Sequence, residues 1–260
     1  MDLELKGKRA LVTGSTEGIG FAIAKALAKE GVQVIVNGRS SEKVKKAIQA
    51  LGHGDFIEAA IDLSTREGVN ALIDAIKDVD ILINNLGIYE AKPFEEICDE
   101  DWLHMFEVNV LSGVRLSRAF FPKMIKKDFG RILFISSESG VSIPSDMIHY
   151  GMTKSAQIAI SRGLAELTKG TNVTVNTILP GPTRTKGVND FVEAIAKSKH
   201  ISIEKVEEEF FETVRPTSLI KRFSEPDEVG ALAAFLSSPK AGSINGAAIR
   251  IEGGIIKSMI

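Results

Sequence analysis

The chain has 260 residues, of which 44% are hydrophobic and 25% charged, and its net charge is −2 at pH 7. This length and composition suit one sizeable core, so we expect a single domain over residues 1–260. Acidic and basic residues are mixed along the chain, which leaves no sustained positive field for nucleic acid. With Cys98 as the only cysteine and four scattered histidines, the sequence predicts neither an internal disulfide nor a metal site.

The amino-terminal segment MDLELKGKRALVTG lacks the charged and then apolar pattern of a signal peptide. No uninterrupted apolar run in the sequence is long enough to cross a bilayer. We therefore expect a cytoplasmic protein with no membrane partner.

Short apolar segments alternate along the chain with stretches of helical pattern. They cover residues 9–14, 32–38, 55–62, 79–85, 130–137, 172–181 and 246–254. This alternation is typical of an α/β protein in which a parallel sheet of about seven strands carries crossover helices on both faces.

The first apolar segment runs directly into TGSTEGIG, residues 13–20, and then into a helical pattern. Glycine lets the backbone approach a phosphate closely, and a helix N-terminus offers free amides and partial positive charge. In the first strand-to-helix turn of a repeating βα chain, this pattern predicts a Rossmann-type, doubly wound fold with a dinucleotide site. A tight turn that binds nothing is the alternative. The residues expected to contact the dinucleotide are Gly14, Ser15, Thr16, Gly18, Ile19 and Gly20.

The end of the second segment bears on the choice between NADP(H) and NAD(H). An NAD enzyme commonly has a carboxylate there, whereas this chain has Asn37, followed by Arg39 and Ser40. Asn37 does not repel a phosphate, and the guanidinium of Arg39 suits one. Glu17 in the glycine loop argues in the other direction, because it could pair with Arg39. We predict a preference for NADP(H), with use of NAD(H) left open.

Two helix starts carry capping signals. Ser64 with Glu67, and Ser224 with Asp227, fit capping boxes, which predict helices that begin near residues 65 and 225.

A further helix is expected from about residue 150, directly after the apolar segment that ends at Ser137. Its helical spacing places apolar residues on one face, and Tyr150 and Lys154 four residues apart, so that both side chains point the same way. The residues of the apolar face are Ala156, Ile160, Gly163, Leu164 and Leu167.

Residues 186–222 depart from the alternation, with a charged and helical pattern that we interpret as an insertion over the site. At its start, Arg184 and Lys186 could face an anionic substrate, or they could simply be solvated. The identity of the substrate does not follow from this segment.

Several motifs together resemble those of the short-chain dehydrogenases/reductases of ordinary length. They are TGSTEGIG, NNLG at residues 84–87, Asn109, ISS ending at Ser137, YGMTK at 150–154, PGPTRT at 180–185 and EGG at 252–254. Their order and spacing match that family over nearly the whole chain, and the resemblance implies an NAD(P)-dependent enzyme.

The resemblance implies a catalytic role for four residues. Tyr150 would act as general acid or base, although the pKa of a free tyrosine is about 10. A positive charge on Lys154, one helical turn away, would favour its phenolate. Ser137 would hydrogen-bond the substrate oxygen, and Asn109 would support a water relay to Lys154, which also holds the nicotinamide ribose. An ordinary solvated helix face, with Asn109 as a buried structural residue, is the alternative.

Further cofactor contacts are carried over from the same resemblance. Those on the adenosine side are Asp62, Leu63, Asn84, Asn85 and Gly87, and those near the nicotinamide are Pro180, Gly181, Thr185, Tyr150 and Lys154. Leu86 departs from the alanine that is usual in the family. Tyr89 either borders the substrate pocket or is a packing aromatic.

These residues predict an oxidoreductase that interconverts a secondary alcohol and a ketone by hydride transfer, with a small carbonyl or alcohol compound as its partner. Reduction of an oxo group on a carrier-bound or carboxylated substrate is left open. A dinucleotide-binding sensor or scaffold without turnover is the alternative. By resemblance we also expect a homotetramer, in which the helix over about residues 101–127 and the helix of Tyr150 pair across a two-fold axis.

Overall fold

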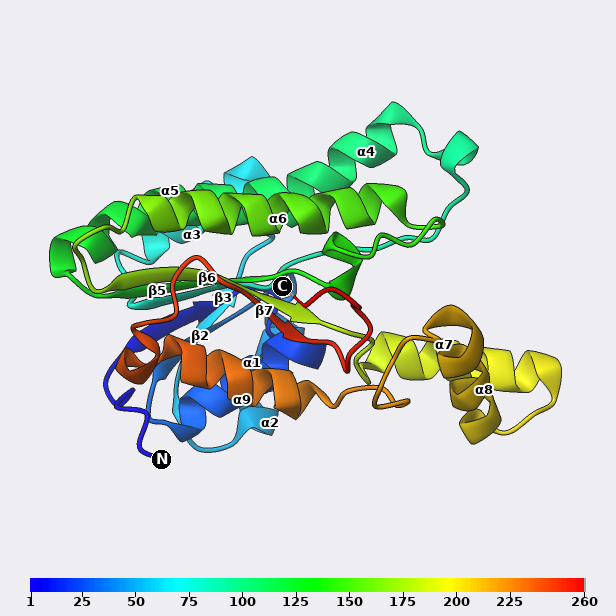
Figure 1. Ribbon diagram of the computed structural model, residues 1–260. Coiled ribbons are helices and arrows are strands. Elements are labelled where there is room, and N and C mark those ends of the chain that lie inside the picture. Colours follow the sequence, from blue (N-terminus) through cyan, green and yellow to red (C-terminus); the bar gives the residue numbers. More distant parts are fainter. Residues whose placement is uncertain (260) are drawn as a thin grey trace.

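The predicted apolar segments form one parallel sheet in the computed structural model, which describes residues 1–259 (Figure 1). The strand order is β3-β2-β1-β4-β5-β6-β7. The strands are β1 (Arg9–Val12), β2 (Gln33–Gly38), β3 (Asp55–Ala60), β4 (Ile81–Asn84), β5 (Gly130–Ile135), β6 (Val173–Pro180) and β7 (Ala248–Ile251). The order reverses between β1 and β4, and ligands of open α/β sheets bind at such a switch point. The predicted α/β, Rossmann-type fold is confirmed.

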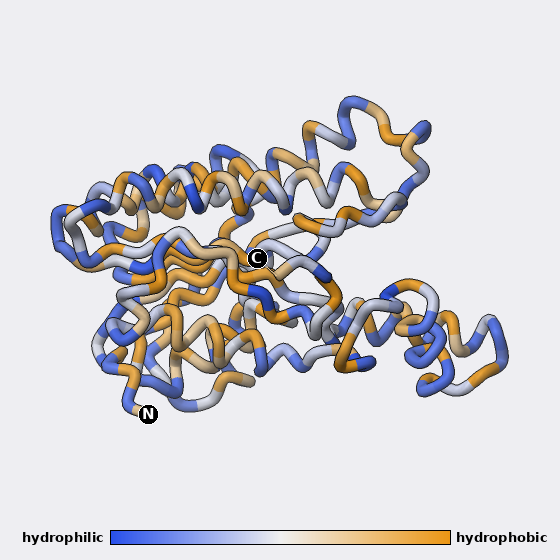
Figure 2. The backbone as a smooth tube through the Cα atoms, viewed as in Figure 1, coloured by the Kyte–Doolittle hydropathy of each residue, from blue (hydrophilic) through white to orange (hydrophobic). Residues whose placement is uncertain are grey.

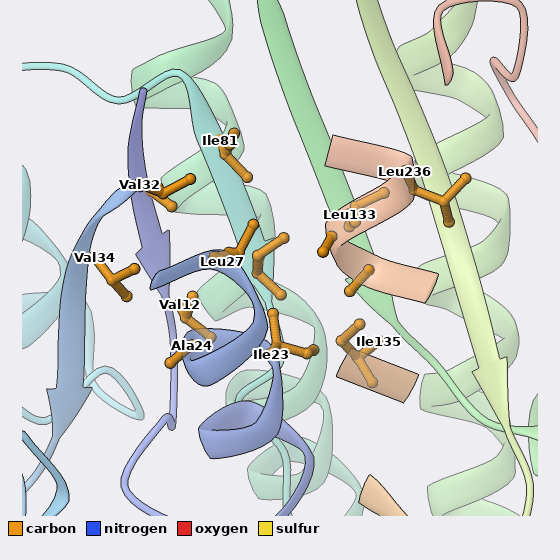
Figure 3. Close-up of a cluster of buried hydrophobic side chains, with 14 of the residues drawn as sticks. Val12, Ile23, Ala24, Leu27, Val32, Val34, Ile81, Leu133, Ile135 and Leu236 are labelled. Carbon is orange, nitrogen blue, oxygen red and sulfur yellow. The ribbon is translucent and has the colours of Figure 1, made fainter. Parts of the chain in front are cut away.

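Helices cover both faces of the sheet (Figure 1). On one face lie α1 (Gly18–Lys29), α2 (Ser41–Leu51) and α9 (Pro226–Ser237), and on the other lie α3 (Arg66–Ala75), α5 (Ser112–Lys127) and α6 (Ile148–Glu166). Alternate residues of β2 enter different cores: Val34 and Val36 pack toward α1, and Ile35 packs toward the opposite helices. The strands accordingly form a hydrophobic band (Figure 2), and Figure 3 shows the core beneath α1.

Both helices with capping signals begin one residue later than expected, at Arg66 and Pro226. The predicted cap residues, Ser64 and Ser224, were wrong. The hydroxyl of Thr65 accepts the backbone amide of Gly68, and the carboxylate of Glu228 accepts the amide of Glu225 at 2.7 Å. Several neighbouring hydroxyls and carboxylates could cap each helix, and the backbone conformation at the helix start determines which of them does so.

The expected helix over residues 101–127 is a longer run with a change of pitch inside it. Here α4 (Asp99–Phe106) passes through a π-helical turn, η2 (Glu107–Leu111), into α5. Such turns widen the helix and are frequent at functional sites. Asn109 lies at the centre of this one.

The helix of Tyr150 is α6, and its buried face is polar. Thr153, Lys154, Gln157 and Ser161 are buried toward the sheet and η2. The expected apolar face lies at the margin of the core: Ile160 and Leu164 pack against it, whereas Leu167 is 65% exposed and space is open around Gly163.

The segment expected to be an insertion forms α7 (Lys186–Lys199), α8 (Ile203–Glu209) and a π-helical turn, η4 (Phe210–Val214). It extends to one side of the sheet (Figure 1) and has its own small core, which includes Val192, Val206 and Phe211. Across residues 1–259, the structure contains no helix with both the length and the apolarity that crossing a membrane requires.

Candidate active site

The glycine loop packs so closely that side chains are excluded from it. A Cβ on Gly20 would lie 2.4 Å from the carbonyl oxygen of Gly14 and 2.5 Å from Nδ2 of Asn85. Gly18 has a φ of 59°, a conformation that glycine adopts without strain. No side chain caps the start of α1 and no acid lies in its first turn. The first amides of α1 can therefore hold an anionic group.

Two residues expected to touch the cofactor are buried beneath this loop. Ser15 is 0% exposed, and its hydroxyl donates to the carbonyl of Val12 at 2.7 Å. Asn37 is 2% exposed; its Oδ1 accepts the amide of Gly14 at 3.1 Å, and its Nδ2 donates to the carbonyls of Ala59 and Ile61. Both side chains therefore support the loop, and their contact with a cofactor stays a prediction.

The NNLG segment also supports the loop. Nδ2 of Asn85 donates to the carbonyls of Thr13 and Gly14 at 2.9 and 3.1 Å. Asn84 points the other way: it is buried and donates to the hydroxyl of Ser117 at 3.2 Å. The side chain of Asn84 therefore faces α5, and its expected contact with the adenosine side stays a prediction.

Arg39 and Ser40 follow β2 at the surface. Arg39 is exposed and makes no ion pair within residues 1–259, and Glu17 is likewise exposed and unpaired in that range. Ser40 caps α2 by accepting the amide of Lys43 at 3.4 Å. Glu17 and Arg39 do not pair with each other in this conformation, so the guanidinium of Arg39 is available to bind a phosphate.

The third strand is followed by Asp62 and Leu63. Oδ1 of Asp62 accepts the amide of Ser64 at 3.0 Å, which leaves the other carboxylate oxygen available. Leu63 is 2% exposed and its side chain packs in the core, so only its backbone can face a ligand.

Ser137 and Tyr150 line one cavity of about 630 Å³ beyond the carboxyl end of β5. Ser137 lies close enough to the Tyr150 phenol to lower its pKa, and the ring of Tyr89 meets the Tyr150 ring edge-on with centroids 6.3 Å apart. Tyr89 also lines this cavity, which favours the prediction that it borders the substrate pocket over the alternative that it is a packing aromatic.

Lys154 lies beneath Tyr150 and is 4% exposed. Its Nζ donates to the carbonyl of Ile135 at 2.9 Å and to Oε1 of Gln157 at 3.3 Å, and lies 5.5 Å from the centroid of the Tyr150 ring. A Cβ on Gly87 would be 3.5 Å from this ammonium, so Gly87 keeps the approach to Lys154 open.

Burial governs the protonation of this pair. It raises the pKa of Tyr150 to about 12, against the opposing effect of the hydrogen bond with Ser137, while the charge of Glu138 raises it further. Burial also lowers the pKa of Lys154 to about 8. Because both groups lose hydration, burial by itself favours the neutral form of each; that Lys154 favours the phenolate of Tyr150 stays a prediction.

Asn109 is 1% exposed, and its side chain holds the loop after β4. Its Oδ1 accepts the amide of Ile88 at 2.7 Å, and its Nδ2 donates to the carbonyl of Ile88 and to the hydroxyl of Thr153. The backbone carbonyl of Asn109, inside the π-helical turn, accepts Nε2 of Gln157 at 2.6 Å.

Gln157 was missed by sequence reasoning, although a signal existed. It follows Lys154 by three residues, so the two share a helix face. Its amide bridges the Lys154 ammonium and the Asn109 carbonyl, and the second contact fixes which amide atom faces Lys154.

The segment expected near the nicotinamide borders both the cavity and the glycine loop. Gly181 lines the cavity, and a Cβ there would lie 2.8 Å from Cα of Glu252. Pro180 ends β6, and Cγ2 of Thr185 would lie 3.3 Å from a Cβ on Gly18. The chain thus brings Thr185 against the loop of α1.

A second pair that the sequence did not reveal is Glu138 with Arg215. Nε of Arg215 lies 2.9 Å from Oε1 of Glu138, whose side chain is 3% exposed. Burial raises the pKa of Glu138, and the charge of Arg215 opposes this. Because 77 residues separate them, only the fold brings them together.

The two cations at the start of the insertion are both paired. Arg184 contacts Glu207 through two hydrogen bonds of 2.7 and 2.9 Å and also contacts Glu225, and Lys186 contacts Asp190 at 3.2 Å. The alternative in which they face an anionic substrate therefore loses support.

Comparison with known proteins gives consistent matches. Residues 8–196 match the family described as short chain dehydrogenase. Two proteins of Bacillus subtilis (strain 168), the uncharacterized oxidoreductases YvrD and YvaG, are 50% and 48% identical to the chain, with 100% of both chains covered. L-Sorbose reductase from Gluconobacter frateurii, solved in complex with NADPH and L-sorbose, is 30% identical, with a TM-score of 0.94 and 100% of both chains covered.

Proposed function

Because the chain belongs to the short-chain dehydrogenase family and is an oxidoreductase, we propose that it interconverts a secondary alcohol and a ketone with a nicotinamide cofactor. The observation that carries this proposal is the convergence of Ser137 and Tyr150 on one cavity, with Lys154 beneath Tyr150. The uncapped, glycine-lined start of α1 lies at the same edge of the sheet.

The residues present fit a dinucleotide. The free first amides of α1 and the exposed Arg39 suit its phosphates. Since Arg39 is unpaired within residues 1–259, we propose NADP(H) as the preferred cofactor; the NADPH complex of L-sorbose reductase supports this choice.

The chain's own groups supply the proton chemistry. The bound cofactor would supply the hydride for reduction. Tyr150, with a pKa raised to about 12, is neutral at pH 7 and can donate its proton to the carbonyl oxygen of a ketone. The hydroxyl of Ser137 orients that oxygen, and the Lys154 ammonium stabilises the phenolate that remains. Gln157 and the Ile135 carbonyl hold the ammonium in place.

Replacing Tyr150 by phenylalanine tests this mechanism. The change removes one hydroxyl and little volume, so turnover of ketones and alcohols should be lost while cofactor binding, followed by NADPH fluorescence, remains near native. Tyr89→Phe serves as the matched control, because it removes a hydroxyl from the same cavity without touching the proposed proton donor. Near-normal turnover by Tyr150→Phe would refute the assignment. Cofactor binding without turnover on a broad panel by the native protein would instead favour a sensor.

We also propose that the protein is a cytoplasmic homotetramer. The outward face of α6, with Leu167 exposed and Gly163 open to close approach, is suited to pair with a second copy. Light scattering should give four times the chain mass of 28.1 kDa, and a monomer at micromolar concentration would contradict the proposal. Cell fractionation tests the location.

A further inference from the structure

The cavity at Tyr150 carries more negative than positive side chains. Four carboxylates line it, and within residues 1–259 only two cations do so. The carboxylates are Glu90, Glu138, Asp146 and Glu209, and the cations are Lys199 and Arg215.

Both cations are already engaged by carboxylates of the same cavity. Arg215 contacts Glu138 at 2.9 Å and also donates to the carbonyl of Val214 at 3.0 Å. Lys199 contacts Glu209 at 2.8 Å. An anion entering this cavity would have to compete with an existing carboxylate for either cation.

The remaining two carboxylates have no such neutralisation. Glu90 and Asp146 are exposed at the cavity wall and make no ion pair in the part of the chain that the structure describes. The nearby Lys92 contacts Asp101 instead. The side chains that line the cavity therefore carry a net negative charge, while Lys92 acts on Glu90, and the Lys154 ammonium on Tyr150, from outside this set.

Apolar side chains that are in contact with water also line the cavity. Tyr89, Phe191 and Val214 line it and are 65%, 56% and 51% exposed. Val188 and Phe210 extend this surface from α7 and η4. Apolar surface of this kind favours an occupant that covers it.

We propose that this site takes uncharged ketones with an apolar body and rejects carboxylates and other anions. The carboxylates of the cavity wall, both paired and unpaired, are the residues that determine this specificity. The inference rests on the proposed function, since it concerns the substrate of the same site.

Isomeric ketones that differ in charge provide the test. Ethyl 4-oxopentanoate is neutral, whereas its isomer 4-oxoheptanoate is an anion at pH 7, and further pairs extend the series to longer chains. With NADPH, kcat/KM should favour the neutral member of each pair by about tenfold or more, because two uncompensated charges repel the carboxylate. Equal efficiency, or a preference for the carboxylates, would overturn the proposal.

Glu209→Gln isolates the local charge. It frees Lys199 at the cavity wall and should raise kcat/KM for 4-oxoheptanoate by about threefold, with little change for the ester. Glu208→Gln is the matched control: it makes the same change in net charge one residue earlier, at an exposed side chain that pairs with Lys205 outside the cavity. Equal effects of the two variants would show that net charge, and not the wall, governs selectivity.

Binding measurements keep this inference separate from catalysis. In complexes with NADPH, fluorescence titration of each pair should show tighter binding of the neutral member, whether or not it is reduced. Tighter binding of the carboxylates would overturn the substrate class. Absence of turnover on the whole panel, with neutral ketones still bound preferentially, would count against the proposed function alone.

Discussion

Replacing Lys154 by methionine should remove a specific pH dependence from the stability of the cofactor-free protein. Lys154 is 4% exposed, and burial lowers its pKa to about 8 from the ordinary value of 10.5. Below pH 8 the native protein holds a buried ammonium, which is unfavourable relative to the unfolded chain. Methionine has a similar length and no charge.

The magnitude follows from the two pKa values. Between about pH 8 and 10.5 the unfolded chain still binds the proton that the folded protein has released, so the free energy of unfolding rises with pH. From pH 7 to pH 10 this contribution amounts to about 2.5 kcal/mol, at about 1.36 kcal/mol per pKa unit. The variant also loses hydrogen bonds to Ile135 and Gln157, but that cost does not depend on pH.

Urea unfolding at pH 7, 8, 9 and 10 measures the effect. The native protein should gain stability relative to Lys154→Met across this series, while the variant is inactive at every pH. Lys45→Met, which removes an exposed ammonium, serves as the control and should run parallel to the native protein. A constant difference between native and Lys154→Met from pH 7 to 10 would refute the reasoning.

Three further experiments address the cofactor, the lysine and the insertion. Arg39→Ala should lower kcat/KM for NADPH by about tenfold or more and spare NADH, since a hydrogen bond to a charged group contributes about 1.5–3 kcal/mol; a native preference for NADH, or an unchanged NADPH value, would contradict this. Gln157→Leu leaves the carbonyl of Asn109 buried without its side-chain partner, so this variant should have a lower kcat and a shifted pH profile of kcat. Gln157→Glu should shift that profile to higher pH. If both variants have the pH profile of the native protein, Gln157 has no positioning role. If residues 186–222 close over the site, proteolysis there should slow only when cofactor and a substrate analogue are both present.

Local patterns in the sequence by themselves determined the fold class, and the resemblance of its motifs to a known family indicated the proposed catalytic residues. Alternating apolar and helical segments predict a parallel sheet, because each strand must be buried on both faces. The spacing of Tyr150 and Lys154 on one helix face, after the strand that leads to Ser137, places all three at the carboxyl ends of the strands. These features depend on residues close together in the chain.

Only the tertiary structure decided which side chains are free to act. Asn37 stands where the sequence suggested a residue that selects the cofactor. Pairing of β2 with β1 and β3 buries Asn37 and engages its side-chain amide, so Arg39 is the residue left at the surface to contact a cofactor. The polar face of α6, including Gln157, is buried against η2, a packing that apolar periodicity cannot predict. Likewise the pairing of Arg215 with Glu138, and with it the charge of the cavity, depends on contacts between distant segments, which sequence spacing does not specify.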